Sequence, residues 1–184
     1  MERGYMFLEK ELIYECICGN RKAQKELYEK YSPYFFGICR RYMPTIEDAE
    51  DVLVMGFTTI FASLNTFKGE GSFENWMKRI IINTAIVTIR ENKKHYNLDE
   101  EYDEEGKNGN LKSENIIYSQ INTKYIMEQI RQLPEQKKMI FNLYAIEGYS
   151  YDKISEVLEI SVGTVRSQLA KARKILQKKI KIVE

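Results

Sequence analysis

The residues between Ser161 and Lys181 bring cations and hydroxyls together in one short stretch. Seven of these residues are basic and none is acidic. Arg and Lys side chains hold phosphates or donate to base edges, and Ser and Thr hydroxyls bond to either. The simpler alternative is a solvated helix whose basic end is favoured by the helix dipole. The imbalance of charge favours contact with DNA over that alternative.

Apolar residues recur just before and within this stretch with the spacing of a helix-turn-helix, at Ile154, Leu158, Ile160, Val165 and Leu169. The first two would be buried by the first helix, the third by the turn, and the last two by the second helix. Glu159 stands where many such turns have glycine. The motif therefore predicts a left-handed backbone at a residue that carries a Cβ.

The second helix of this motif can be phased at about 100° per residue. Its buried face would carry Val165, Leu169, Ala172 and Leu176. The opposite face would carry Gly163, Ser167, Ala170 and Lys174, flanked by Thr164 and Lys171 on one side and by Arg166 and Arg173 on the other. Small residues, hydroxyls and cations on that outer face suit a helix that enters a major groove.

A second group of candidate residues surrounds the glycine loop of residues 68–71. The loop is flanked by the aromatic residues Phe67, Phe73 and Trp76, and basic residues follow at Lys78, Arg79, Arg90, Lys93 and Lys94. Rings stack on exposed bases while cations hold phosphates, a combination that suits single-stranded or melted nucleic acid. Aromatic residues at helical spacing are more often core residues, and for Phe73 and Trp76 a core position is the first interpretation.

The elements that position these residues are predicted to be helices, so the predicted fold class is all-α. Two small helical domains are expected over residues 1–95 and 118–184. Residues 96–117 carry seven acidic and two basic side chains and are interpreted as a flexible acidic linker. Thr45, Ser72 and Ser150 stand where N-cap residues are expected. One helix is expected from about residue 134 to residue 146.

Hydropathy and the first residues argue against a membrane-spanning or secreted protein, and the net charge has to be considered segment by segment. The chain has 28 basic and 27 acidic residues, a formal net charge of +1. This total hides a net charge of −5 over residues 96–117 and +5 over residues 118–184. No apolar stretch approaches the ~20 residues of a spanning helix, and the first residues lack a secretory signal. A cytoplasmic protein without membrane insertion is expected.

Catalytic and metal-binding groups are sparse. Cys16, Cys18 and Cys39 are interpreted as free thiols, because the only histidine, His95, is not placed to complete a zinc site. The glycine loop lacks a phosphate-loop pattern, and no acid-base pair is evident. No enzymatic activity, metal or cofactor is therefore expected.

Two sets of motifs occur along the chain, one after the other, and their order is typical of one protein family. The first set consists of Asp48-Ala49-Glu50-Asp51-Val52-Leu53, Phe57, Phe73-Glu74-Asn75-Trp76-Met77, Arg79-Ile80, Asn83 and Arg90. The second consists of Leu133-Pro134, Gly148-Tyr149-Ser150-Tyr151, Ile154-Ser155 and Ser161-Val162-Gly163-Thr164-Val165-Arg166-Ser167. The sets resemble regions two and four of bacterial sigma-70-type RNA polymerase sigma factors. The presence of these two regions alone, with a short linker, is similar to the extracytoplasmic-function subfamily.

This resemblance implies a sigma factor that binds core RNA polymerase and directs promoter-specific initiation. It places recognition of the −35 element on Thr164, Arg166, Ser167, Lys171 and Lys174. It places recognition of the −10 element on the loop from Lys68 to Ser72 and on Asn83, Thr84, Val87 and Arg90. The implied partners are promoter DNA, the clamp helices of the largest polymerase subunit and the flap of the second-largest subunit. Family members often have an anti-sigma partner as well.

Two stretches depart from the family pattern. The helix implied to face the polymerase carries Asp48, Asp51, Val54 and Met55, but the family usually has a polar Gln-Glu pair where Val54 and Met55 stand. A different clamp contact, weaker binding and a surface covered by a partner are the open interpretations. Val87 stands where an Asp is common, which bears on the −10 sequence that is recognised.

The alternative function is a helix-turn-helix regulator that acts without the polymerase core. It accounts for residues 150–181 but leaves the motifs between Asp48 and Arg90 unexplained. Sequence-specific duplex binding by the intact chain without the core would favour it.

Overall fold

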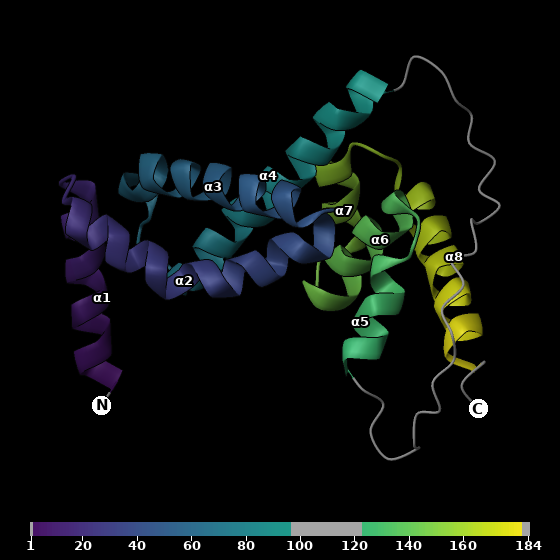
Figure 1. Ribbon diagram of the computed structural model, residues 1–184, viewed down its shortest axis with the longest axis horizontal. Helices are drawn as coiled ribbons and strands as arrows, with labels where there is room; N and C mark the ends of the chain where they lie inside the picture. Colours follow the sequence, from purple (N-terminus) through teal and green to yellow (C-terminus); the bar gives the residue numbers. More distant parts are fainter. Residues whose placement is uncertain (1, 97–122, 182–184) are drawn as a thin grey trace. The chain divides into compact units, whose positions relative to one another are not determined.

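A computed structural model describes residues 2–96 and 123–181 (Figure 1). Every regular element in these two ranges is helical, which confirms the predicted all-α class. The chain divides into two compact units, Met1–Tyr96 and Asn97–Glu184. The predicted acidic linker lies outside the described residues, apart from Tyr96, the last residue of a helix. None of the described helices is long and apolar enough to cross a membrane.

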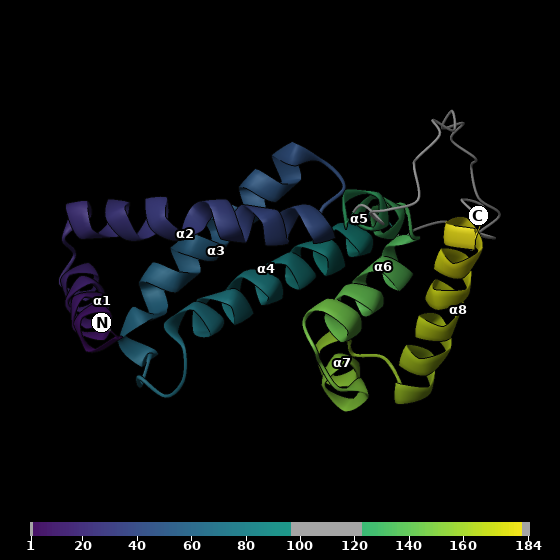
Figure 2. The ribbon, with the colours of Figure 1, turned by 90° about the horizontal axis from the view of Figure 1, so that it is seen from below.

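The first unit consists of four α-helices and one 3-10 turn: α1 (Glu2–Ile17), α2 (Arg21–Tyr42), α3 (Ile46–Ser63), η1 (Leu64–Thr66) and α4 (Phe73–Tyr96). Helices α2, α3 and α4 pack against one another (Figures 1 and 2). Their shared core contains the fully buried side chains Leu27, Phe35, Ile38, Ile60, Met77, Ile81 and Ile86.

Local residues fix where these helices begin and how closely they pack. Thr45 caps α3, because its hydroxyl accepts from the Asp48 amide at 3.0 Å and donates to the Asp48 carboxylate at 2.6 Å. The Ser72 hydroxyl accepts from the amide of Asn75 at 3.4 Å at the start of α4. Gly56 is buried in α3, and a Cβ there would lie 2.5 Å from Cδ1 of Ile81. The missing side chain at Gly56 thus lets α3 and α4 approach closely.

The second unit contains α5 (Thr123–Arg131), α6 (Glu135–Phe141), the π-helical turn η2 (Asn142–Ile146), α7 (Tyr151–Leu158) and α8 (Val162–Lys181). Helix α8 packs against α5, α6 and α7 (Figure 2). The core of the second unit contains Ile140, Leu143, Ile154, Val165, Leu169 and Ala172.

The predicted single helix over residues 134–146 differs from the structure in its last turn. The α-helix ends at Phe141, and a π-helical turn closed by the bond from the Glu147 amide to the Asn142 carbonyl, at 3.0 Å, follows. The wider turn holds an extra residue, which rotates the side chains that follow. Apolar periodicity cannot distinguish this turn from a continuous helix.

Candidate nucleic-acid interface

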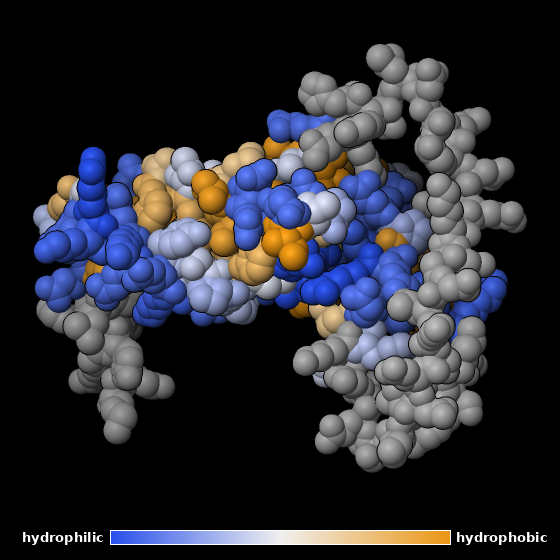
Figure 3. Space-filling view, viewed as in Figure 1, coloured by the Kyte–Doolittle hydropathy of each residue, from blue (hydrophilic) through white to orange (hydrophobic). Residues whose placement is uncertain are grey.

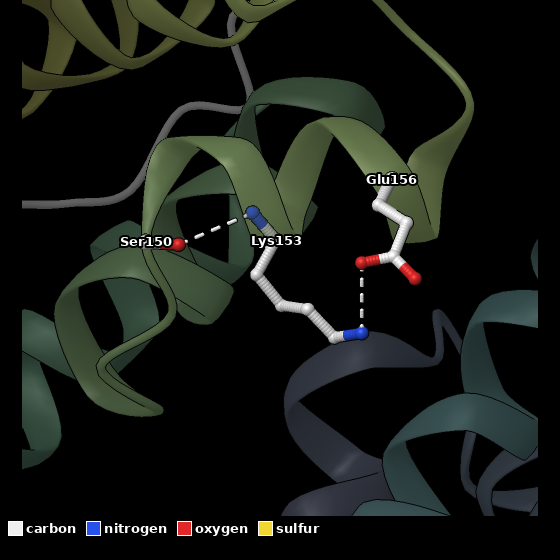
Figure 4. A network of polar contacts seen from close by, with 3 residues as sticks. All are labelled: Ser150, Lys153 and Glu156. Atoms are coloured by element: carbon white, nitrogen blue, oxygen red, sulfur yellow. Dashed lines mark hydrogen bonds and ion pairs between the residues drawn. The ribbon is translucent and has the colours of Figure 1, made fainter.

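Helix α7 is held at both ends by local hydrogen bonds. At its start the Ser150 hydroxyl accepts from the amide of Lys153 at 3.2 Å, as predicted for an N-cap (Figure 4). The Lys153 ammonium also reaches the Glu156 carboxylate at 3.0 Å, a solvent-exposed pair that adds little stability (Figure 4). At the other end the Ser155 hydroxyl donates to the carbonyl of Ile160 at 2.5 Å. This last bond spans the end of α7 and holds the turn that follows it.

The turn between α7 and α8 has the predicted left-handed residue. Glu159 lies at φ 55° and ψ 41°, a conformation that costs a residue with a Cβ about 1–2 kcal/mol. The Ile160 amide returns to the Ser155 carbonyl at 3.2 Å, which closes the turn. Ser161 then caps the start of α8: its hydroxyl accepts from the Thr164 amide at 3.0 Å and shares a 2.8 Å hydrogen bond with the Thr164 hydroxyl.

Helix α8 has the two faces that its sequence predicts. Val165, Leu169 and Ala172 are buried, whereas the outward face exposes Arg166, Ser167, Lys171 and Lys174. Thr164 is half-buried, and its hydroxyl is already engaged with Ser161. Four of the five residues implied for −35 recognition therefore lie exposed on one helix, with the cations and the hydroxyl that contact with duplex DNA requires.

Two tyrosines beside α8 were not among the residues predicted for this interface. The rings of Tyr144 in η2 and Tyr151 in α7 stack with centroids 5.0 Å apart and planes 9° apart. The Arg166 guanidinium carbon lies 5.5 Å from the Tyr151 ring centroid, and that of Arg173 lies 5.2 Å from the Tyr144 centroid. The four side chains come from three elements, so no periodic pattern in the sequence could pair them.

The tyrosine hydroxyls interact as well as the rings. A hydrogen bond from Tyr151, and then one from Arg173, lowers the pKa of Tyr144 below its usual value. The same bond to Tyr144 raises the pKa of the Tyr151 hydroxyl. Arg173 therefore lies over the ring of Tyr144 and favours the ionised form of its hydroxyl.

In the first unit, the loop implied for −10 recognition is an exposed turn before α4. Lys68 and Ser72 at its ends are exposed. Gly69 and Gly71 have φ values of 75° and 82°, which glycine adopts without the steric cost paid by other residues. The loop therefore presents backbone and a cation to solvent.

An aromatic cluster supports this loop. The Phe67 ring lies 5.1 Å from that of Phe73 and 5.5 Å from that of Trp76, measured between centroids. Phe73 is 3% exposed, which confirms its core interpretation, whereas Phe67 and Trp76 are half-buried. The cluster is thus part core and part surface.

The α4 residues implied for −10 recognition share one side of the helix. Asn83 and Val87 are exposed, and Thr84 and Arg90 are half-buried. The Thr84 hydroxyl donates to the carbonyl of Ile80 at 2.9 Å, so within the unit it acts as a helix back-bond. Three of these residues line a shallow hollow between α3 and α4, formed by Met55, Thr59, Ile80, Asn83, Thr84 and Val87.

The α3 residues implied for polymerase contact differ in character. Asp48 is half-buried and engaged in the cap of the helix, while Asp51 is exposed. Val54 and Met55 are 57% and 45% exposed, and apolar side chains are visible on the surface over α3 (tan and orange in Figure 3). Met55 also lines the hollow beside α4, so the structure brings the implied polymerase-contact and −10 residues together there.

Thiols and acidic groups give no sign of a metal centre in residues 2–96 and 123–181. Cys16 and Cys39 are buried and Cys18 is exposed, all as free thiols. No three His, Cys, Asp or Glu side chains cluster in these ranges closely enough to hold an ion.

Comparison with protein families gives two matches along the chain. Residues 27–95 match the family model of sigma-70 region 2, and residues 123–176 match that of sigma-70 region 4. The first match covers the glycine loop and the α3 and α4 faces. The second covers the helix-turn-helix and the tyrosine pair.

Similar proteins include the ECF RNA polymerase sigma-E factors of Haemophilus influenzae and Escherichia coli K12. Each is 29% identical over 170 residues, which span 88% of this chain and 89% and 88% of the two relatives. Among solved structures, the sigma factor RpoE of Bartonella quintana, in complex with the anti-sigma factor NepR, aligns with a TM-score of 0.53. It shares 16% identity and covers 87% of this chain and 98% of that one, a likeness that supports the fold.

Proposed function

Because the chain belongs to the sigma-70 family, and within it to the extracytoplasmic-function sigma factors, we propose a division of promoter recognition between its two units. A sigma factor of this kind is not an enzyme; it directs the recognition of promoters by RNA polymerase. In the proposal, α8 of the second unit recognises the −35 element as duplex DNA. The loop before α4 and the exposed side of α4 capture the −10 element. In this proposal the two domains that share promoter recognition are residues 1–95 and 118–184, and residues 96–117 are the linker between them.

The exposed outward face of α8 is the observation that carries the proposal. Arg166 can donate two parallel bonds to a guanine edge, and Ser167 lies centrally enough to contact a base or phosphate. Lys171 and Lys174 supply point charges for phosphates. Thr164 is half-buried at the start of the helix, where its methyl group can contact the DNA while its hydroxyl caps the turn.

Capture of the −10 element needs a surface for bases that have left the duplex. The exposed loop offers Lys68 for phosphate and glycine backbone for close approach, and the half-buried rings of Phe67 and Trp76 stand behind it. On α4, Asn83 can form paired bonds to a base edge, and the exposed apolar side chain of Val87 favours contact with a methyl group or a base face. Arg90 would then bind a phosphate of the DNA backbone.

Core polymerase would bind the first unit along α3. The exposed Asp51 can pair with a basic residue of the clamp helices, and Val54 and Met55 would be covered by an apolar contact. Asp48 would act mainly by fixing the start of α3, since its carboxylate is engaged with Thr45. The second unit would contact the polymerase flap.

An anti-sigma partner is a further part of the proposal. The Bartonella quintana relative was solved with its anti-sigma factor NepR. In this chain Val54 and Met55 expose apolar surface that a protein partner would cover when the polymerase is absent. The site of action would be the cytoplasm, where polymerase and chromosome meet.

The proposed division between the units is tested by exchanging promoter elements. Transcript starts mapped after overproduction of the chain supply a natural promoter, and holoenzyme reconstituted with the cognate core is then assayed on altered templates. Arg166→Ala should reduce the discrimination against base changes in the −35 element. Asn83→Ala should reduce the discrimination against base changes in the −10 element. Arg166→Ala that alters discrimination only at −10 positions would contradict the assignment.

A further inference from the structure

The tyrosine pair beside α8 lies where it can act on two arginines of the DNA-facing helix. Tyr144 and Tyr151 stack on each other, Arg166 lies over Tyr151, and Arg173 lies over Tyr144. All four side chains belong to the second unit. We propose that Tyr144 and Tyr151 are positioning residues for −35 recognition, which hold the guanidinium groups of Arg166 and Arg173 in place before DNA binds. This inference rests on the proposed role of α8.

A ring under a guanidinium group leaves that group free to bind. The ring attracts the flat face of the guanidinium group, whereas all five N–H donors of that group lie in its plane and point outward. A stacked arginine therefore keeps the paired donors that match guanine or phosphate. Both Arg166 and Arg173 are exposed, so the donors that face solvent are accessible to a duplex.

Positioning matters because an exposed arginine side chain is otherwise disordered. Fixing such a long side chain when DNA binds removes rotamer freedom and weakens the complex. Contact with the rings removes that freedom in the free protein instead. The tyrosines are well suited to this role, because each ring is itself fixed by the other and by its own helical element, η2 or α7.

The two arginines extend along one edge of the helix. They are seven residues apart, which separates their backbones by about 10.5 Å along α8 and leaves them within about 20° of the same direction. Arg173 is therefore placed beside the outward face like Arg166, although only Arg166 was predicted as a contact.

The test compares variants that remove the rings with variants that remove only the hydroxyls. The full-length chain is measured by fluorescence anisotropy on a duplex carrying a mapped −35 element and on a scrambled duplex of equal length. The double variant Tyr144→Leu/Tyr151→Leu should bind the −35 duplex about 4- to 25-fold more weakly, since each exposed cation–ring contact corresponds to about two- to five-fold. Tyr144→Phe/Tyr151→Phe keeps both rings and should remain within about threefold of the wild type.

Binding to the scrambled duplex separates positioning from a general loss of structure. All basic charges remain in the leucine variant, so its affinity for scrambled DNA and the salt dependence of that affinity should be unchanged. Equal weakening on both duplexes, together with a lower melting temperature, would show that the tyrosines only support the fold and would overturn the proposal. An unchanged preference for the −35 duplex would overturn it too.

A double-mutant cycle tests whether Tyr144 acts through Arg173. Tyr144→Leu should weaken −35 binding in the wild type but add little in an Arg173→Ala background. The same loss in both backgrounds would contradict the proposal. A wild-type chain that does not distinguish the two duplexes, alone or in holoenzyme, would instead contradict the proposed role of α8, so the two failures are distinguishable.

Discussion

Ser167→Glu is the substitution that probes the outward face of α8 most sharply. Ser167 is exposed near the middle of that face, on the opposite side from Val165 and Leu169. Its hydroxyl donates to the carbonyl of Thr164 at 3.0 Å, a bond that solvent replaces when it is lost. Glu is also a better helix former than Ser, so the free energy of unfolding should change by no more than about 0.5 kcal/mol.

The effect of this substitution on DNA binding follows from charge. A carboxylate about 4 Å from one phosphate is repelled by about 1 kcal/mol in bulk water and about 4 kcal/mol at an effective dielectric of 20. These limits correspond to about five- to 1,000-fold weaker binding to the −35 duplex. Desolvation of the new carboxylate in the groove shifts the expected value towards the upper limit.

The assay is anisotropy of a labelled −35 duplex with the full-length chain, alongside thermal unfolding followed by circular dichroism. Ser167→Gln is the matched control, since it has nearly the same size without the charge and should retain most of the affinity. Wild-type affinity in Ser167→Glu, with the melting temperature unchanged, would refute the docking of this face on DNA.

Three further predictions follow from burial and charge. Leu169→Ala should destabilise the second unit by about 2–5 kcal/mol, because Leu169 is 1% exposed, and this should be visible as a lower melting temperature. Lys171→Ala should weaken binding to all duplexes alike and reduce the slope of log affinity against log salt by about one, measured by titration at several salt concentrations; an unchanged slope would argue against phosphate contact. Burial raises the pKa of Cys39 to about 12 and that of Cys16 to about 11, so little of either thiol is in its reactive thiolate form at pH 8, whereas Cys18 is exposed. A thiol reagent at pH 8 should therefore modify only Cys18 in the native chain and all three in denaturant, as measured by mass spectrometry; labelling of Cys39 in the native chain would contradict its burial.

The helix-turn-helix was predictable because local rules decide most of it. Apolar spacing gave the buried side of α8, and the hydroxyl of Ser150 marked the start of α7. The left-handed Glu159 was expected from the turn alone, since the motif requires that conformation whatever residue occupies it. Residues that act within one turn of the chain are those for which sequence patterns are most informative.

The tyrosine pair could not be predicted, because its geometry depends on two features that the sequence does not display. The π-helical turn sets the direction of Tyr144, and the crossing of α7 and α8 brings Tyr151 under Arg166. Both depend on tertiary packing. Similarly, the hollow beside Met55 and Val87 depends on the close approach of α3 and α4 at Gly56, whose reason is visible only in the position of Ile81.

Reconstituted transcription tests the central claim most directly. Core RNA polymerase from the cognate organism is incubated with a genomic template, with and without the purified chain, and transcript starts are sequenced. We expect a specific set of starts that depends on the chain, with shared −10 and −35 elements, and co-elution of the chain with the core. No chain-dependent transcript together with no binding to the core would contradict the assignment of promoter recognition to this protein.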